Sequence, residues 1–304
     1  MDAAEQNQAE DLYDELRKLS APDGPLNFLA PTATVNNPKW FIRLGSEPDE
    51  EYILQAERLP LHRRLVRKKL ESYILSPSNY QAINLSGPPG AGKSRQVRKL
   101  LGDKFGDYIN IDPDEFKVDL LQQALDDGSY DSFIKPESIR KLENSGHRVF
   151  PLDLASLVHE ESSILAQALR IEALDIGKNV IIDLVLSNYQ SAIDLAEGLQ
   201  LKGYTIWVID VETTSEISSA RVKSRWLEAR RRAIESDDAL GGRWVPSEYI
   251  RFVFRDDGKS VPKTNARAVY NQFHATKRYQ LYWTDTAESD PELVEEQNKE
   301  TGES

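Results

Sequence analysis

From residue 80 onwards, short apolar runs alternate along the chain with amphipathic stretches. The apolar runs are rich in β-branched residues, which is typical of strands buried on both faces of a parallel sheet. Strands are predicted at residues 80–85, 108–111, 179–183, 205–211 and 279–284. Helices are predicted at residues 93–101, 113–124, 153–173, 189–201 and 215–235. The pattern therefore indicates an α/β fold of three layers with a mostly parallel central sheet.

The remaining segments flank this alternating region. Residues 1–50 are predicted to form an N-terminal extension with a short helix at 9–19. The main domain is predicted at 51–284, and it opens with a leading helix at 51–76 in which leucines recur near a 3.6-residue period. Residues 285–304 are acidic and are predicted to be a disordered tail. The extension is compatible with an addition specific to a subgroup or with an inhibitor acting in cis.

Composition narrows the class of protein. The 304 residues are 39% hydrophobic and 29% charged, and no stretch approaches the length of a membrane span. The chain has 0 cysteines and 4 scattered histidines, which argues against disulfides and zinc sites and favours a cytoplasmic location. A net charge of −12 argues against nonspecific binding to nucleic acid, which requires a surplus of basic residues. We therefore expect neither a membrane nor a nucleic acid as partner.

One motif indicates a specific ligand. The pattern G-x-x-x-x-G-K-[ST] is completed by Gly87, Pro88, Pro89, Gly90, Ala91, Gly92, Lys93 and Ser94. A predicted strand precedes it and a predicted helix follows, as a phosphate-binding P-loop requires and an ordinary Gly/Pro turn does not. Lys93 is then expected to reach the β- and γ-phosphates, while the Ser94 hydroxyl ligates Mg²⁺. With the adjoining Arg95, these residues predict a site for ATP or GTP together with Mg²⁺.

Carboxylates follow the predicted strands. Phosphoryl transfer needs a carboxylate that accepts the proton of the acceptor hydroxyl. Asp112 and Asp114 begin a predicted helix, and because an N-cap needs only one carboxylate, Asp114 is our candidate for the base. Asp112 is a candidate for acceptor binding or a simple cap. Asp183 is preferred over Asp210 as the strand-end carboxylate near Mg²⁺, because a polar loop follows it, although either could cap its loop.

Polar residues interrupt one apolar helix face. Glu161 and Ser162 lie on the apolar stripe of the helix predicted at 153–173. They are expected either to point into a substrate cleft or to lie on a locally exposed turn.

Arginines crowd the helix predicted at 215–235, and Arg243 follows it. A solvated helix face is the ordinary explanation. In an acidic chain with a P-loop, some of them are instead candidates for clamping phosphate groups. Arg225 and Arg243 are preferred because a tryptophan adjoins each.

The order of these motifs resembles that of the zeta toxins, the kinase half of epsilon/zeta toxin–antitoxin systems. The resemblance spans roughly three-quarters of the chain, from about residue 57 to about residue 282. The motifs that carry it are the P-loop, residues 111–117, residues 157–163, residues 179–183 and an arginine pair ending in residues 243–246. Asp114 follows Lys93 by 21 positions (114 − 93).

The resemblance implies a P-loop kinase in which Lys93 and Ser94 hold the phosphates of ATP and Mg²⁺. Asp114 is then the catalytic base, and Asp183 takes the place of an acidic residue beside the acceptor. The arginines that neutralise the transferring phosphate are matched by Arg225 and Arg243.

The resemblance also implies a reaction and a partner. Zeta toxins are best known for phosphorylating the 3′-hydroxyl of the amino sugar in UDP-N-acetylglucosamine, and an antitoxin blocks their nucleotide site. The family commonly has Gly-Thr where this chain has Leu184 and Val185. Relatives with this core include an effector that phosphorylates NAD, so a kinase acting on NAD or another nucleotide is the alternative. A nucleotide-gated binding protein that transfers no phosphate is the alternative of a different class.

Overall fold

The structure is a computed structural model that describes residues 3–45, 51–183, 185–236 and 240–299. The chain forms two compact units, each assembled from three segments. Unit 1 comprises Met1–Arg67, Pro113–Ala166 and Lys223–Glu248. Unit 2 comprises Lys68–Asp112, Gln167–Val222 and Tyr249–Ser304. The two units are described separately below.

Unit 2 contains a six-stranded sheet in the order β4-β5-β3-β6-β7-β8. Its strands are β3 (Gln81–Ser86), β4 (Ile109–Ile111), β5 (Val180–Asp183), β6 (Thr205–Glu212), β7 (Thr276–Trp283) and β8 (Glu292–Asn298). All neighbours pair in parallel except β7 and β8, which are antiparallel. The prediction of a mostly parallel sheet is confirmed, and each predicted strand is present within a few residues of its expected bounds.

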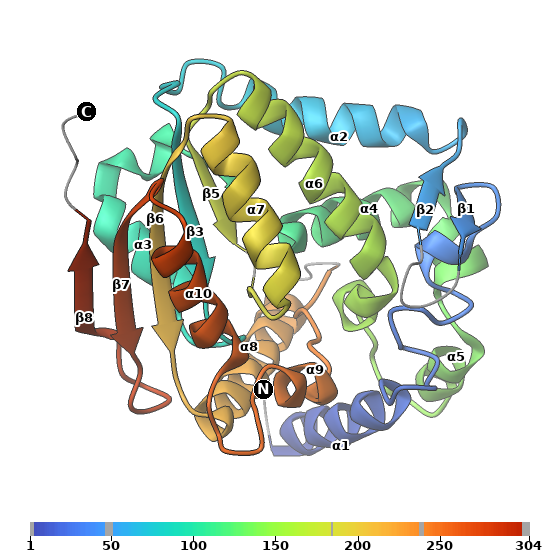
Figure 1. The fold of residues 1–304 in the computed structure, drawn as a ribbon. Helices are drawn as coiled ribbons and strands as arrows, with labels where there is room; N and C mark the ends of the chain where they lie inside the picture. The colour runs from blue at the N-terminus through green and yellow to red at the C-terminus, as the bar shows by residue number, and fades with distance from the viewer. Residues whose placement is uncertain (1–2, 46–50, 184, 237–239, 300–304) are drawn as a thin grey trace. The chain divides into compact units, whose positions relative to one another are not determined.

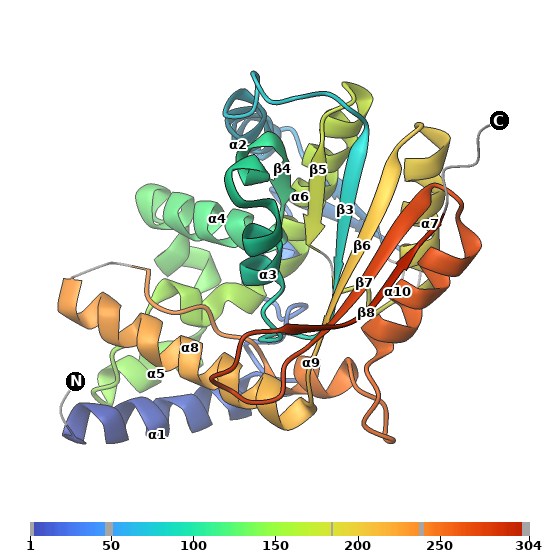
Figure 2. The same cartoon turned by 90° about the vertical axis from the view of Figure 1, so that its left-hand side faces the viewer.

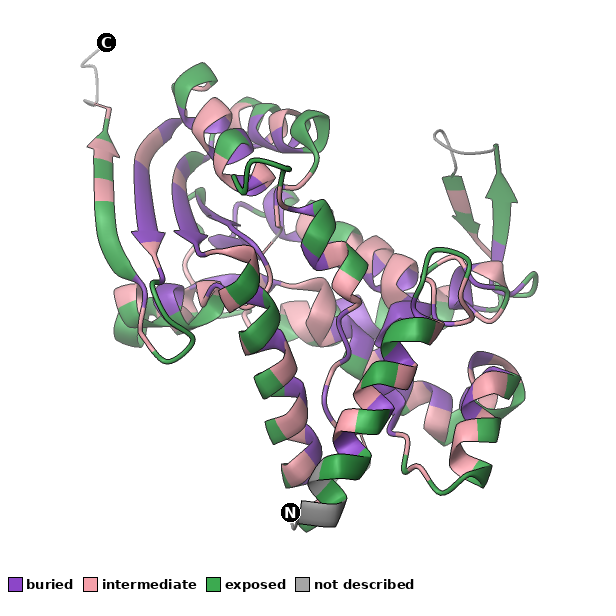
Figure 3. Ribbon diagram, turned by 90° about the horizontal axis from the view of Figure 1, so that it is seen from below, coloured by how far each residue is buried: buried purple, intermediate pink, exposed green. Residues whose placement is uncertain are grey.

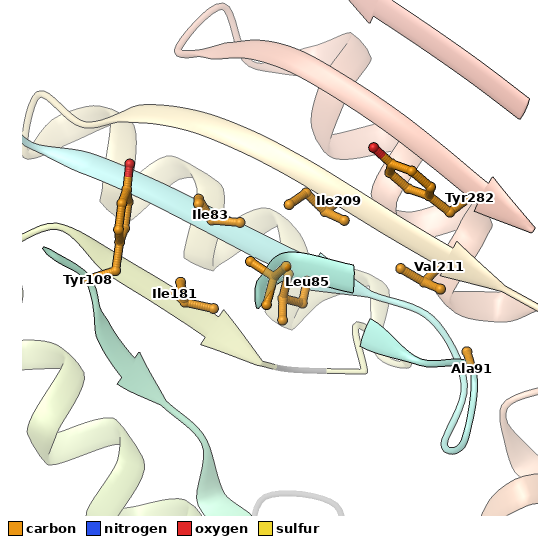
Figure 4. Packing of buried hydrophobic residues seen from close by; sticks show 9 residues of the cluster. Ile83, Leu85, Ala91, Tyr108, Ile181, Ile209, Val211 and Tyr282 are labelled. Carbon is orange, nitrogen blue, oxygen red and sulfur yellow. The ribbon is translucent and has the colours of Figure 1, made fainter. Parts of the chain in front are cut away.

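Helices cover both faces of this sheet. Helix α3 (Lys93–Leu101) lies on one face, as Figure 2 shows, while α7 (Tyr189–Leu201) and α10 (Val261–Gln272) lie on the other (Figure 1). The face beneath α3 buries a continuous apolar cluster (Figure 4). Its members are Ile83, Leu85, Ala91, Val97, Tyr108, Ile181, Ile209, Val211 and Tyr282. Burial on both faces explains why the central strands are almost wholly apolar in sequence.

The acidic C-terminal segment corrects one expectation. Residues 292–298 form the edge strand β8 rather than a disordered tail, and residues 300–304 lie outside the described residues. Most of β8 is exposed whereas β7 is largely buried, as the colouring of Figure 3 shows. An exposed edge strand has few apolar side chains, and backbone pairing with β7 places it. Arg267 and Arg278 also pair with Glu295 and Glu296 of β8.

Unit 1 is built mainly from helices and also carries a short hairpin. Its described elements include α1 (Ala3–Leu19), the hairpin strands β1 (Phe41–Leu44) and β2 (Glu51–Leu54), α4 (Pro113–Asp127), α5 (Glu137–Asn144) and η4 (Pro151–Val158). It also contains the 3-10 turn η1 (Thr34–Asn36) and the π-helical turn η3 (Tyr130–Ile134). The helices α2 (Leu59–Glu71), α6 (His159–Asp175), α8 (Ser215–Ser236) and α9 (Ser247–Phe252) contribute residues to both units. Unit 2 also contains the 3-10 turn η2 (Gly102–Asp107) and most of α9. The first two residues of α9 belong to unit 1.

Two predicted helices differ from the observed ones. The leading helix expected at 51–76 is β2 followed by α2, because residues 51–54 pair with β1. The helix expected at 153–173 begins as the 3-10 helix η4 and becomes α-helical only at His159. Among the described residues, none of the helices is long and apolar enough to cross a lipid bilayer.

The described part of the predicted N-terminal extension, residues 3–45, belongs to unit 1. Leu12 and Leu16 of α1 are fully buried. Tyr13 packs edge-on against Trp226 and Trp244 at centroid distances of 5.6 and 4.9 Å. This aromatic cluster joins α1 to α8 and to the segment that carries Arg243.

Candidate active site

The P-loop of unit 2 connects β3 to α3, and its three glycines adopt backbone conformations that other residues rarely adopt. Gly87, Gly90 and Gly92 have φ angles of 123°, 76° and 106°. A Cβ atom on Gly87 would lie 1.9 Å from the Val211 carbonyl oxygen, so even alanine is excluded there. Gly92 is the N-cap of α3, and the positive end of the helix dipole therefore faces the loop.

The two side chains at the start of α3 meet the carboxylate of Asp183. The Ser94 hydroxyl donates to Asp183 Oδ2 at 3.3 Å, and Lys93 Nζ lies 3.9 Å from Asp183 Oδ1. Lys93 also donates to the carbonyls of Gly87 (2.9 Å) and Pro88 (3.4 Å). The parallel register of β3 and β5 places Leu85 opposite Asp183, which brings this carboxylate beside the loop.

These oxygens fit a magnesium ion. Mg²⁺ is a hard cation that P-loop proteins hold through one serine or threonine hydroxyl, a strand-end carboxylate, phosphate oxygens and water. Ser94 and Asp183 are the matching pair. No cluster of three or more histidine, aspartate or glutamate ligands occurs in the described part of the chain, so an all-protein metal cage is not present there.

The alternative carboxylate, Asp210, faces elsewhere. Its neighbours Ile209 and Val211 point into the cluster beneath α3, and side chains alternate along a strand. Asp210 therefore faces the α10 side of the sheet, where it accepts a hydrogen bond from Tyr279 at 2.8 Å. Asp183 and Asp210, which end strands of similar sequence, therefore lie in different surroundings: Asp183 beside the P-loop and Asp210 on the α10 side of the sheet.

In unit 1, Asp114 lies in the first turn of α4 within a group of cations. Its carboxylate pairs with Lys117 one turn along the helix (3.1 Å) and with Arg243. Burial alone would raise the pKa of Asp114, but the charges of Arg243, Lys117 and Arg225 outweigh it and hold the pKa far below its usual range. The lowered pKa keeps Asp114 ionised at neutral pH. Its side chain is 34% exposed, so the carboxylate is accessible to a molecule outside the protein.

Two neighbours of this cluster were not among the predicted site residues. Burial and the charge of Lys117 lower the pKa of His159, so its imidazole is neutral at physiological pH. Lys117 itself is almost fully buried, which is uncommon for lysine outside an ion pair. Its spacing of three residues from Asp114 on one helix face could have signalled the pair.

The arginines of α8 have different roles. Arg230 is buried against Asp153 (3.5 Å), and Arg231 and Arg232 pair with glutamates of their own helix. Arg225 is exposed and contributes charge at Asp114. Of the two predicted clamp arginines, Arg243 therefore contacts the candidate base and Arg225 lies within its electrostatic range.

Glu161 and Ser162 were expected either to point into a substrate cleft or to lie on an exposed turn, and the structure contradicts both expectations. Glu161 has no exposed surface, and it accepts hydrogen bonds from Arg58 Nε (2.7 Å) and from His62 (2.9 Å). Ser162 is also fully buried and donates to the carbonyl of His159 at 2.6 Å. The two residues form neither a cleft wall nor an exposed turn, because the polar break is filled by a buried ion pair.

Three other predicted positions are placed as follows. Asp112 is partly buried in the single-residue connection between β4 and α4. Arg95 is an exposed residue of α3 that pairs with Asp290 at 2.7 Å. Leu184 lies outside the described residues, and Val185 is partly buried.

A P-loop between the central strand of a parallel sheet and the helix that follows is the arrangement typical of phosphate-binding α/β proteins. The sequence matches the family described as zeta toxin over residues 67–286. Because this match covers more than half of the chain, the protein belongs to the zeta toxin family. No curated protein sequence matches the chain.

Solved structures share the fold at low sequence identity. AvrRxo1-ORF1 in complex with AvrRxo1-ORF2 has 18% identity over 80% of this chain and 68% of its own. Its structure with sulphate ions has a TM-score of 0.54, and its structure with ATP has 0.53. The PezAT toxin–antitoxin system of Streptococcus pneumoniae has 17% identity, 80% and 81% coverage and a TM-score of 0.50. The expected P-loop kinase-like fold is thereby confirmed.

Proposed function

We propose that this protein is an ATP-dependent kinase that phosphorylates a hydroxyl group of a small molecule and thereby inhibits growth. The observation that carries the proposal is Asp114, an accessible carboxylate surrounded by Arg243, Lys117 and Arg225. A P-loop that only gated a partner would have no use for such a group. Membership of the zeta toxin family and the likeness to a structure solved with ATP support the same activity.

The proposed step transfers the γ-phosphoryl group of ATP to the acceptor oxygen. The bond between the γ-phosphorus and the β–γ bridging oxygen breaks, the bond from phosphorus to the acceptor oxygen forms, and ADP leaves. The acceptor proton passes to Asp114. A carboxylate of low pKa suffices because the transition state is loose, so the hydroxyl becomes acidic only as its oxygen binds phosphorus. Arg225 and Arg243 then stabilise the charge on the transferring group.

Donor binding is assigned to unit 2. Backbone N–H groups of the P-loop and the Lys93 ammonium would bind the β- and γ-phosphates. Ser94 and Asp183 would hold Mg²⁺, which neutralises charge on these phosphates when it is bound with the nucleotide.

UDP-N-acetylglucosamine is the acceptor that we place first, on the family resemblance. Val185 stands where the family commonly has threonine, so a hydroxyl beside the acceptor is absent. That difference favours NAD or another nucleotide as the second candidate. We also propose an antitoxin as the protein partner, supported by the toxin–antitoxin system among the similar structures.

The test is a screen for products by mass. The full chain is incubated with ATP, Mg²⁺ and each candidate acceptor, and an added phosphoryl group is sought by mass spectrometry. Asp114→Asn should lower turnover about 10²- to 10⁴-fold, the usual contribution of a general base. Asp126→Asn, an exposed residue of the same helix, is the matched control and should leave turnover unchanged.

The outcomes distinguish the alternatives. Phosphate on NAD but not on the sugar nucleotide would reverse the order of the two acceptors. Full turnover by Asp114→Asn would eliminate Asp114 as the base. Tight ATP binding with no product from any metabolite would favour the nucleotide-gated binding protein.

A further inference from the structure

Three successive carbonyl groups of the P-loop, those of residues 89–91, are bound from outside the loop. Ser218 Oγ donates to the Pro89 carbonyl at 2.7 Å, and Thr284 Oγ1 donates to the Ala91 carbonyl at 3.0 Å. Arg221 Nη1 donates to the carbonyls of Gly90 (3.3 Å) and Ala91 (3.4 Å). Because the C=O of one residue and the N–H of the next point in opposite directions across a planar trans peptide, these bonds turn the N–H groups of residues 90 and 92 inward. The Ala91 N–H between them donates to the Pro88 carbonyl at 3.3 Å and closes a turn within the loop. Inward N–H groups are what an anion-binding loop requires.

The guanidinium group of Arg221 has no hydrogen-bonding capacity left for a ligand. Besides its two P-loop acceptors, its Nε donates to the Ala287 carbonyl (2.9 Å) and its Nη2 donates to the carbonyls of Thr286 (3.1 Å) and Ser289. A guanidinium carries five N–H donors, and five carbonyl acceptors surround this one. Arg221 therefore orients backbone on both of its sides and does not bind phosphate itself.

The second backbone segment that Arg221 binds is the connection between β7 and β8. This connection also meets the P-loop side of α3 directly, through the Arg95–Asp290 pair and through Pro291, which packs against Gly92. Strand β8 holds its far end through pairing with β7. Residues 287–298 lie beyond the segment that matches the family.

We propose that Arg221 is a positioning residue for nucleotide binding, and that the β7–β8 connection completes the outer support of the P-loop. The inference rests on the proposed function, since it concerns how tightly the same loop holds the phosphates of ATP. Without Arg221, the Gly90 carbonyl loses its hydrogen-bond donor, and the Ala91 carbonyl keeps only the donor from Thr284. The peptide planes of the loop can then rotate, and the inward N–H groups are no longer held before the nucleotide arrives.

The experiment measures binding of Mg-ATP and Mg-ADP to the full chain by calorimetry. Arg221→Met should weaken both about 10- to 100-fold, the range found when outer-shell partners of metal sites are removed. The nucleotide affinity of Arg221→Lys should lie between those of the wild type and Arg221→Met, because one ammonium cannot reach both backbone segments at once. In turnover assays the KM for ATP should rise while the KM for the acceptor is unchanged, a separation that general loss of stability would not produce.

Two further variants make the test decisive. Arg278→Met is the matched control, because Arg278 pairs with Glu296 of β8 without contacting the P-loop, and it should bind nucleotide normally. Ser218→Ala removes a single hydrogen bond to the loop and is expected to fold even if Arg221→Met does not. It should weaken binding about threefold to tenfold, the worth of one such bond.

Binding within twofold of the wild type by Ser218→Ala and by folded Arg221→Met would overturn the inference and leave the proposed kinase intact. An equal loss in Arg278→Met would also overturn it, because the effect would then be general. A wild-type protein that binds no nucleotide would overturn both proposals.

Discussion

The carboxyl groups of Asp210 and Glu212 are buried side by side in unit 2. We therefore predict that Glu212→Gln stabilises the protein. Asp210 and Glu212 lie two residues apart on β6, so they face the same side of the sheet, and at most 1% of either is exposed. Asp210 accepts a hydrogen bond from Tyr279 (2.8 Å) and Glu212 accepts one from Ser260 (2.9 Å). Burial and the charge of Asp210 raise the pKa of Glu212 to about 10, and burial raises that of Asp210. The pair therefore holds one proton at neutral pH.

The magnitude follows from the proton that folding takes up. In the unfolded chain glutamate titrates near 4.5, so at pH 7 the protein must bind a proton about 2.5 pH units above that value. At about 1.36 kcal/mol per unit, this costs roughly 3 kcal/mol of stability. Because the folded pKa is raised, the unfolded state binds fewer protons, and the free energy of unfolding falls as pH rises from about 4.5 to about 10.

Glutamine keeps the shape of the protonated acid and needs no proton. It can still accept from Ser260 and donate to Asp210. We expect Glu212→Gln to raise the free energy of unfolding by about 2–3 kcal/mol at pH 7, slightly less than the full linkage cost because an amide N–H is a weaker donor than a carboxylic acid. The advantage should grow by about 1.4 kcal/mol for each pH unit up to pH 9.

The assay is urea unfolding at pH 6, 7, 8 and 9, followed by circular dichroism. Glu197→Gln, an exposed position on α7, is the control and should change nothing at any pH. A stability difference between Glu212→Gln and the wild type that is constant from pH 6 to 9 would refute the shared proton. A variant less stable than the wild type at pH 9 would refute it as well.

Three other substitutions test separate parts of the structure. Gly87→Ala should abolish ATP binding in a titration, because its Cβ would lie 1.9 Å from a carbonyl oxygen of β6 at a φ of 123°. Tyr13→Ala should lower the free energy of urea unfolding by about 2 kcal/mol through loss of two edge-on aromatic contacts, whereas Tyr13→Phe should cost little. Glu161→Ala should cost about 3–5 kcal/mol in the same assay, since it leaves buried Arg58 without its carboxylate, and a cost below about 1 kcal/mol would contradict the buried pair.

Much of the sheet could be predicted because its signal is local. Strands buried on both faces are mostly apolar, so β3, β5 and β6 are visible as runs in the sequence. No helix was predicted at α10, although its buried Pro262, Ala266, Val269 and Tyr270 recur at helical spacing. Strand β8 is nearly all polar and exists through its pairing with β7, a partner that sequence pattern does not reveal.

The P-loop could likewise be predicted from the sequence. The glycines of the P-loop are required by the conformation of a few consecutive residues, and Lys93 and Ser94 follow at fixed spacing. Asp114 could be singled out because it begins a helix directly after a strand.

The sequence alone therefore determined the family, the parallel sheet and the P-loop motif, since each depends on short-range pattern. Only the tertiary structure decided which polar residues, distant in sequence, contact one another. Glu161 meets Arg58 across 103 positions of chain, and Arg221 meets Gly90 across 131. Periodicity places a residue on a face of its own helix or strand, but it carries no information about which distant segment covers that face.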